Sequence, residues 1–183
     1  GRIGYADDVQ LPGMLYGRIL RSPHGHARIR SINTSKALAL PGVIDVVTGK
    51  DIPELSIYAV DEVCYMGEKI GAVAATDPDI AEDALALIKV VYDVLPAVVD
   101  PVAAMTPGAP EAKLGGRTRP ANGKNLPNVT SHSVIEEGDV EKGFAACEAI
   151  VEHEYRTPIF HQTYMEPNAA TAQVEANGRL TVW

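Results

Sequence analysis

Cysteine is scarce in this sequence. The chain of 183 residues has two, Cys64 and Cys147, which lie far apart and in no Cys-x-x-Cys pair. Two isolated thiols provide neither a disulfide framework nor the ligand set of a zinc or iron–sulfur site. We therefore expect two reduced thiols, and no metal centre built on cysteine from this chain alone.

Long apolar runs and an excess of positive charge are missing as well. No stretch approaches the roughly 18 apolar residues of a membrane span, and no basic-then-apolar leader opens the chain, so we expect a cytoplasmic protein without a membrane partner. The net charge of −8 and the pI near 5.1 argue against nucleic acid as a partner, because non-specific binding to phosphates needs an excess of lysine and arginine. The hydrophobic content of 46% is ordinary for a globular protein.

The best organised stretch begins with two expected strands. Residues 14–21 form an apolar run that predicts a mostly buried strand, which Ser22-Pro23 ends. Residues 27–32 alternate between apolar and polar side chains, the pattern of a strand with one face in solvent.

A helix and a third strand are expected next. Thr34 and Ser35 are good N-cap residues for a helix of about two turns, and Pro41-Gly42 ends it. Residues 43–47 form an apolar β-branched run, which predicts an interior strand.

Residues 60–105 continue this mixed pattern. Residues 60–65 and 69–76 are strand candidates, and Gly71 within the second suggests the close approach of another backbone. Apolar residues recur at helical spacing over residues 77–88, which predicts a helix lying on a sheet. A strand and a short helix should follow, at residues 90–94 and 102–105.

The composition changes at residues 106–128, which are rich in proline, glycine and basic residues and predict a linker between domains. Beyond it we expect strands at residues 129–136, 149–157, 169–175 and 180–183, and a short helix through about residue 146. Asn177-Gly178 is a strong hairpin signal between the last two strands. The chain lacks an initiator methionine and ends within a strand at Trp183, so we interpret it as a piece of a longer polypeptide.

Two histidines in the loop after the first strand invite a chemical interpretation. His24 and His26 could be a metal pair, but no neighbouring cysteine or carboxylate cluster provides further ligands. In the alternative, the histidines bond backbone groups while Arg21, Arg28 and Arg30 pair with carboxylates. A third alternative places the arginines against an anionic partner or cofactor group.

Polar and aromatic residues crowd between two expected strands near residue 160. His161, Gln162 and Glu166 are our candidates for a substrate pocket. The alternative is a structural network that satisfies buried backbone groups. Near the N-terminus, Asp7-Asp8 is expected to be a solvated turn rather than a cation site, because adjacent carboxylates point in different directions.

Several segments together resemble the large, molybdenum-cofactor-bearing subunit of the xanthine dehydrogenase and aldehyde oxidase family. They span most of the chain in the family's order, at residues 11–49, 65–105, 136–173 and 178–183. Within the family, the phrases GRILRSP and ALALIKVVYDVLPA look most like the catalytic subunit of 4-hydroxybenzoyl-CoA reductase, whereas YMEP is closer to the aldehyde and CO dehydrogenase branches.

The resemblance implies an α+β fold. An α/β hammerhead domain of mixed strands and two main helices would occupy residues 1–105, a linker residues 106–128, and the start of the first molybdopterin-binding domain residues 129–183. The full-length subunit would hold molybdenum through a pterin and hydroxylate or dehydrogenate an aldehyde, an N-heterocycle or an aromatic CoA thioester. Iron–sulfur (2Fe-2S) clusters and FAD would sit on partner chains or domains.

The resemblance also implies that this chain is inactive alone. The family's catalytic glutamine, glycine-rich cofactor loop and glutamate base all match positions past Trp183, so we assign no catalytic, cofactor-binding or metal-binding residue here. Two rival hypotheses belong to other classes. One is a noncatalytic hammerhead-type binding or scaffold domain, and the other is metal-dependent hydrolysis at His24, His26 or His161.

Overall fold

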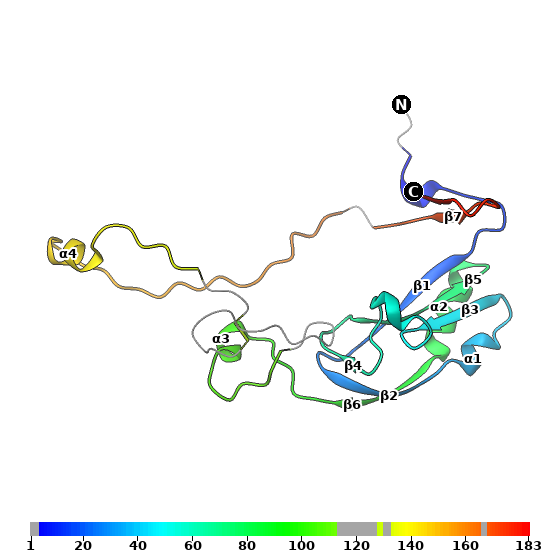
Figure 1. The fold of residues 1–183 in the computed structure, drawn as a ribbon, viewed down its shortest axis with the longest axis horizontal. Coiled ribbons are helices and arrows are strands. Elements are labelled where there is room, and N and C mark those ends of the chain that lie inside the picture. Colours follow the sequence, from blue (N-terminus) through cyan, green and yellow to red (C-terminus); the bar gives the residue numbers. More distant parts are fainter. Residues whose placement is uncertain (1–3, 113–127, 130–132, 166–167) are drawn as a thin grey trace. The chain divides into compact units, whose positions relative to one another are not determined.

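The structure is a computed structural model that describes residues 4–112, 128–129, 133–165 and 168–183. The chain divides into two compact units. We call Pro12–Ser133 the sheet unit, and Gly1–Leu11 together with Val134–Trp183 the hairpin unit. The described elements (Figure 1) are, in order, η1 (Ala6–Asp8), β1 (Tyr16–Arg21), β2 (Ala27–Asn33), α1 (Ser35–Leu38), β3 (Val43–Thr48), η2 (Pro53–Leu55), β4 (Glu62–Val63), β5 (Lys69–Ala75), α2 (Pro78–Leu87), β6 (Lys89–Val94), α3 (Pro101–Ala104), α4 (Val140–Ala145), β7 (Ala172–Val174) and β8 (Leu180–Val182).

The first sheet of the sheet unit has the order β1-β5-β3, with both outer strands antiparallel to β5. This arrangement corrects two predictions. The strand expected to be mostly buried, β1, is largely exposed because it lies at an edge, and Ile19 keeps 39% of its surface. The strand expected in the interior, β3, is the other edge. The small, apolar β5 takes the central place, and its Ile70 and Val73 are almost fully buried.

The second sheet has the order β4-β2-β6, again antiparallel. The prediction of one solvated face on β2 is confirmed, because Ala27 and Ile29 are buried while Arg28 and Arg30 are exposed. The register against β6 shifts between Ile29 and Ser31, which ends the strict alternation.

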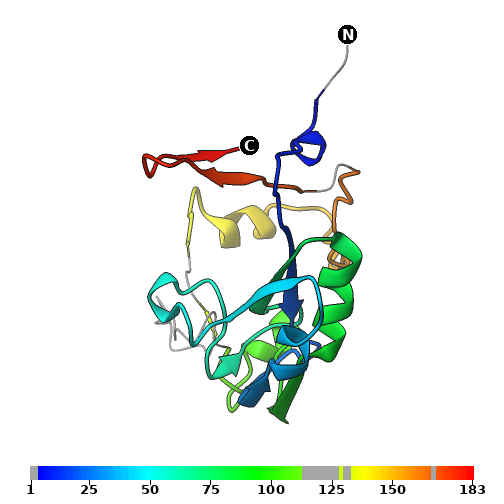
Figure 2. The same cartoon turned by 90° about the vertical axis from the view of Figure 1, so that its right-hand side faces the viewer.

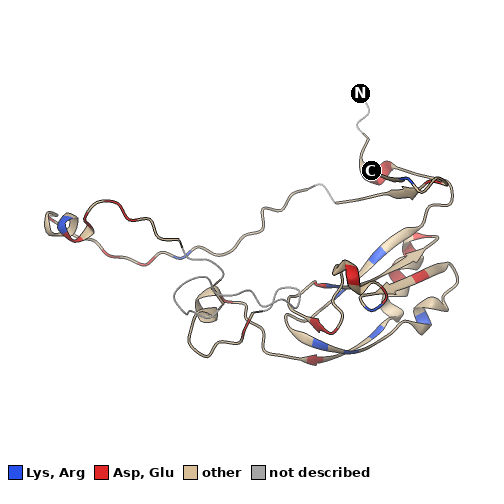
Figure 3. Ribbon diagram, viewed as in Figure 1, with Lys and Arg blue, Asp and Glu red and all other residues tan. Residues whose placement is uncertain are grey.

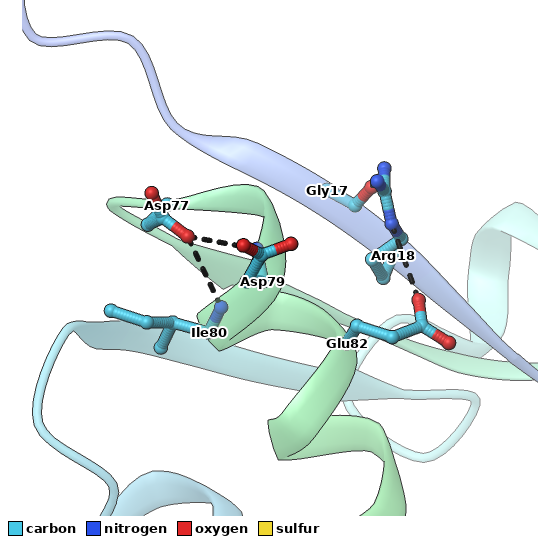
Figure 4. A network of polar contacts seen from close by, with 6 residues as sticks. All are labelled: Gly17, Arg18, Asp77, Asp79, Ile80 and Glu82. Carbon is cyan, nitrogen blue, oxygen red and sulfur yellow. Dashed lines mark hydrogen bonds and ion pairs between the residues drawn. The ribbon is translucent and has the colours of Figure 1, made fainter.

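The helix α2 confirms the expected amphipathic segment. Asp77 is its N-cap, and the carboxylate accepts hydrogen bonds from the backbone nitrogens of Asp79 and Ile80 at 2.8 and 3.4 Å (Figure 4). On the outer side Arg18 of β1 pairs with Glu82 at 3.3 Å. The inner face supplies Ala81 and Ala84 to the buried core, with partly buried apolar neighbours at Leu85 and Ile88.

The helix α1 is shorter than the two turns expected, and the residue that caps it differs. The Asn33 side chain accepts a hydrogen bond from the backbone nitrogen of Ser35 at 3.0 Å, whereas Thr34 makes no side-chain cap bond. Gly42 ends the segment with a φ of +94°, a left-handed conformation that favours glycine.

Gly71 confirms the predicted close approach of a backbone. A Cβ at this position would lie 2.5 Å from the carbonyl oxygen of Val47 on β3. The hydrogen atom in place of a side chain therefore lets the central strand and β3 meet at this point.

The hairpin unit has little regular structure. The expected helix is present as α4, and Asp139 caps it by accepting from the backbone nitrogen of Lys142 at 3.0 Å. β7 and β8 form the expected antiparallel hairpin (Figures 1 and 2). The strands predicted at residues 129–136 and 149–157 do not form in their described parts, because no other strand pairs with them; Val151 remains 91% exposed.

The predicted linker falls largely outside the described residues, and its bounds remain a prediction. At its end Asn128 donates to the carbonyl oxygens of Ala104 and Pro110 and accepts from the backbone nitrogen of Ala112, at 2.7 to 3.0 Å. These bonds hold the turn after α3. Across the described part of the chain, no helix combines the length and apolar character needed to span a membrane.

Candidate functional site

The loop between β1 and β2 is fixed by hydrogen bonds of its own. Ser22 is buried, and its hydroxyl donates to the carbonyl oxygen of His24 and accepts from the backbone nitrogen of the same residue, both at 3.0 Å. The rings of His24 and Tyr92 form a T-shaped contact, with centroids 4.8 Å apart. Burial raises the pKa of Tyr92. The ring of His24 thus packs against β6.

His26 links three segments of the sheet unit. Its Nδ1 lies 2.8 Å from the carbonyl oxygen of Pro96, so that nitrogen donates. Its Nε2 lies 2.6 Å from Oε1 of Glu62, and both side chains are largely buried. The backbone bond is the one that the structural alternative for these histidines predicted. Both ring nitrogens are therefore engaged with atoms of this chain.

Two of the three arginines near the loop, Arg21 and Arg30, have partners in the chain. Arg30 pairs with Asp93 on the neighbouring strand, and this hydrogen bond and charge raise the pKa of Arg30. Arg21 donates from Nη1 to the carbonyl oxygen of Gly67 at 2.9 Å. The expectation of carboxylate pairing is thus met by Arg30, while Arg21 uses a backbone acceptor.

A buried carboxylate, Glu68, holds the turn between β4 and β5. It is 6% exposed and accepts from the backbone nitrogen of Cys64 at 2.5 Å. The main chain of the same turn bonds Ser22 twice, from Ser22 nitrogen to the Glu68 oxygen and from Gly67 nitrogen to the Ser22 oxygen, each at 2.8 Å. Sequence reasoning missed Glu68, because a single acid beside a glycine and a lysine gives no signal of burial.

The hairpin unit contains a surface cavity of about 790 Å³. Its lining comes from the 3-10 helix η1 and from the chain just before β7: Tyr5, Ala6, Asp7, Asp8, Tyr164, Met165, Asn168 and Ala169. Asp8 accepts from the backbone nitrogen of Tyr5 at 2.9 Å, which agrees with the prediction of a solvated turn at Asp7-Asp8. Asn168 donates to the hydroxyl of Tyr164 at 3.3 Å. Two carboxylates and two phenols suit a ligand that carries positive charge or hydrogen-bond donors.

Of the three candidates from the sequence, His161 contacts a residue that lines this cavity. The ring of His161 is 5.5 Å from that of Tyr164, and its Nδ1 accepts from the backbone nitrogen of Thr163 at 3.0 Å. Gln162 is exposed, and Glu166 lies outside the described residues. The role of these three residues stays a prediction. Tyr5 and Asn168 escaped the sequence analysis because only the fold brings positions so distant in the chain together.

Within residues 4–112, 128–129, 133–165 and 168–183, no group of three or more histidine, cysteine, aspartate or glutamate side chains could hold a metal ion. Cys64 and Cys147 are both present as thiols.

Two protein-family profiles match the chain. The profile described as "Aldehyde oxidase and xanthine dehydrogenase, a/b hammerhead domain" matches residues 1–96, and the one described as "Molybdopterin cofactor-binding domain" matches residues 123–183. The first profile alone covers more than half of the chain.

Named relatives agree with these profiles. The chain is 37% identical to a probable xanthine dehydrogenase subunit of Bacillus subtilis, over 100% of this chain and 24% of that protein. It is 33% identical to the carbon monoxide dehydrogenase large chain of Afipia carboxidovorans, over 100% of this chain and 25% of that protein. The chain thus spans about a quarter of the length of these relatives.

The fold agrees as well. The aldehyde oxidoreductase of Desulfovibrio gigas matches 98% of this chain and 21% of its own, with a TM-score of 0.80 and 25% identity. The described residues have mixed strands and few helices, in agreement with this match. The prediction of an α+β fold is confirmed. The chain therefore belongs to the aldehyde oxidase and xanthine dehydrogenase family, with that family's hammerhead domain followed by a match to its molybdopterin cofactor-binding domain.

Proposed function

We propose that the chain is the N-terminal part of the large subunit of a molybdenum-containing hydroxylase or dehydrogenase. The observation that carries this proposal is the order of the two family profiles on one chain, hammerhead first and cofactor-binding domain second. In the complete enzyme the substrate would be an aldehyde, an N-heterocycle or an aromatic CoA thioester. The 4-hydroxybenzoyl-CoA reductase branch stays a prediction from two sequence phrases, since the relatives from Bacillus subtilis and Afipia carboxidovorans have other names.

The partners follow from the same proposal. Relatives are named as subunits or chains of larger enzymes, which supports a hetero-oligomer. Iron–sulfur and FAD subunits would pass on the electrons that the molybdenum centre takes from substrate, in the cytoplasm. The sheet unit would serve as a scaffold, since its two buried clusters give it a core of its own.

The described residues do not by themselves fit the cofactor. A pterin phosphate needs cationic side chains or the N-terminus of a substantial helix. In the described hairpin unit acidic side chains outnumber basic ones, which are Lys142, Arg156 and Arg179 (Figure 3), and α4 has only six residues. The cavity beside Tyr164 is lined by Asp7 and Asp8 and would repel an anion. We therefore assign no described residue to the cofactor and no catalytic step to this chain.

The proposal is tested on the full-length protein purified with its native partners. Candidate reductants are added one at a time under anaerobic conditions: a purine, an aldehyde, an aromatic CoA thioester and carbon monoxide. Bleaching of the flavin and iron–sulfur absorbance by at least one of them is expected, and the control is the same complex from cells grown without molybdate. A complex that lacks both chromophores would instead favour the noncatalytic scaffold alternative.

A further inference from the structure

The chain contains two Asn-Gly pairs, Asn122-Gly123 and Asn177-Gly178. In such a pair no Cβ on the second residue shields its backbone nitrogen from the amide carbon of the asparagine side chain. The structure describes the second pair, which lies in the turn between β7 and β8.

The turn presents the Asn177 side chain in a fixed orientation. The backbone nitrogen of Arg179 donates to Oδ1 of Asn177 at 2.8 Å, and Nδ2 of Asn177 lies 3.5 Å from Oε2 of Glu175. The Arg179 N–H therefore points at the oxygen where negative charge would develop if a nucleophile added to the amide carbon. Hydrogen-bond donors placed in this way stabilise such an addition.

We propose that Asn177 is a site of spontaneous deamidation. The backbone nitrogen of Gly178 loses its proton and bonds to Cγ of Asn177, the C–N bond to the side-chain nitrogen breaks, and ammonia leaves. The cyclic imide that results is opened by water at either carbonyl, which leaves aspartate or isoaspartate at position 177. Water is the only co-reactant, and no atom is oxidised or reduced.

One contact opposes the reaction. The nitrogen of Gly178 donates to the carbonyl oxygen of Glu175 at 2.9 Å, so the turn must open before the nitrogen can attack. The hairpin has three residue pairs, and its Val174, Leu180 and Val182 side chains are 60 to 71% exposed. Turns and loops open locally at free energies below that of global unfolding, which allows the nitrogen to attack in the folded protein.

The product would change the hairpin. The turn is closed by a hydrogen bond from the nitrogen of Glu175 to the oxygen of Arg179 at 2.8 Å, with Gly178 at a φ of +83°. Isoaspartate adds one methylene to the main chain inside this closed turn. Because the turn fixes strand register, the pairing of β7 with β8 would shift or open.

The test incubates the purified full-length protein, natively folded, in buffers of rising pH, and maps its peptides by mass spectrometry. The expected result is aspartate and isoaspartate at position 177, formed several-fold faster than at Asn168, which precedes alanine, and faster at higher pH. Asn122 serves as an internal clock of the same dipeptide chemistry. Asn177→Gln should abolish conversion at position 177 and leave conversion at Asn122 unchanged.

Two results would overturn the proposal. One is Asn177 remaining intact in the folded protein after Asn122 has converted. The other is conversion at position 177 only after the protein has been unfolded in denaturant. Either result would mean that the turn does not open often enough in the folded protein for the amide to react.

Discussion

Substituting Gly71 by alanine tests the packing of the first sheet most sharply. The added Cβ would lie 2.5 Å from the carbonyl oxygen of Val47, which must withdraw by at least about 0.5 Å to reach a tolerable contact. The obstacle is backbone in a paired strand, since Gly71 is opposite Thr48 in the ladder. Overpacking of this kind costs about 1–3 kcal/mol of the free energy of unfolding.

Gly17 provides the matched control. It lies on β1 of the same sheet, and a Cβ built on it meets no atom within 4 Å. Gly17→Ala should therefore raise the free energy of unfolding by about 0.4–1 kcal/mol, because alanine restricts the unfolded chain without straining the folded one. The two identical changes in one sheet are expected to act in opposite directions.

Urea unfolding followed by far-ultraviolet circular dichroism measures both effects. The midpoint should fall for Gly71→Ala and rise slightly for Gly17→Ala, with the slope unchanged in each. Equal midpoints for the two variants would refute the close contact between β3 and β5.

Four further substitutions probe α2 and the carboxylate of Asp51. Leu85→Asp should lower the free energy of unfolding by several kcal/mol, measured by heat or urea, because an unpaired charge enters the apolar layer beneath α2. Ala86→Asp on the exposed face of the helix is the control and should have little effect. Equal losses of stability in the two variants would show that Leu85 does not lie on the buried face. Asp77→Ala should cost about 1 kcal/mol through loss of the N-cap, and an unchanged urea midpoint would contradict it. Hydrogen bonds from the Thr48 side chain and backbone lower the pKa of Asp51 in the folded protein. The stability that the ionised Asp51 contributes is therefore present above the pKa that Asp51 has in the unfolded chain, and it is lost as the pH falls through the lower pKa of the folded protein. In an NMR titration, Thr48→Val should move the Asp51 transition to higher pH, and an identical transition in both proteins would argue against the bond from the Thr48 hydroxyl.

The sequence predicted best where a local signal and a tertiary contact agree. For α2, the N-cap, the early proline and the apolar stripe all indicate one helix with one buried face, and the structure has it. Gly71 was predicted to contact another backbone, because a glycine inside an apolar strand often marks a close approach of a second backbone. The alternation of β2 also survived, apart from the register shift after Ile29.

Predictions failed where the outcome depends on a partner distant in the chain. The runs that became β1 and β3 contain several apolar residues, but only one strand can take the centre of a three-stranded sheet, and β5 takes it. Residues 149–157 have strand-forming side chains, yet a strand needs a neighbour to bond, and none pairs with them in the described structure. The cavity near Tyr164 needs Tyr5, which no local pattern could have linked to it.

The central claim is that this chain belongs to the large subunit of a molybdenum enzyme. Its most direct test is the molybdenum and pterin content of the full-length protein, purified from its source with its partner subunits. We expect one molybdenum and one pterin for each large subunit. An intact, soluble complex that contains neither would contradict the claim.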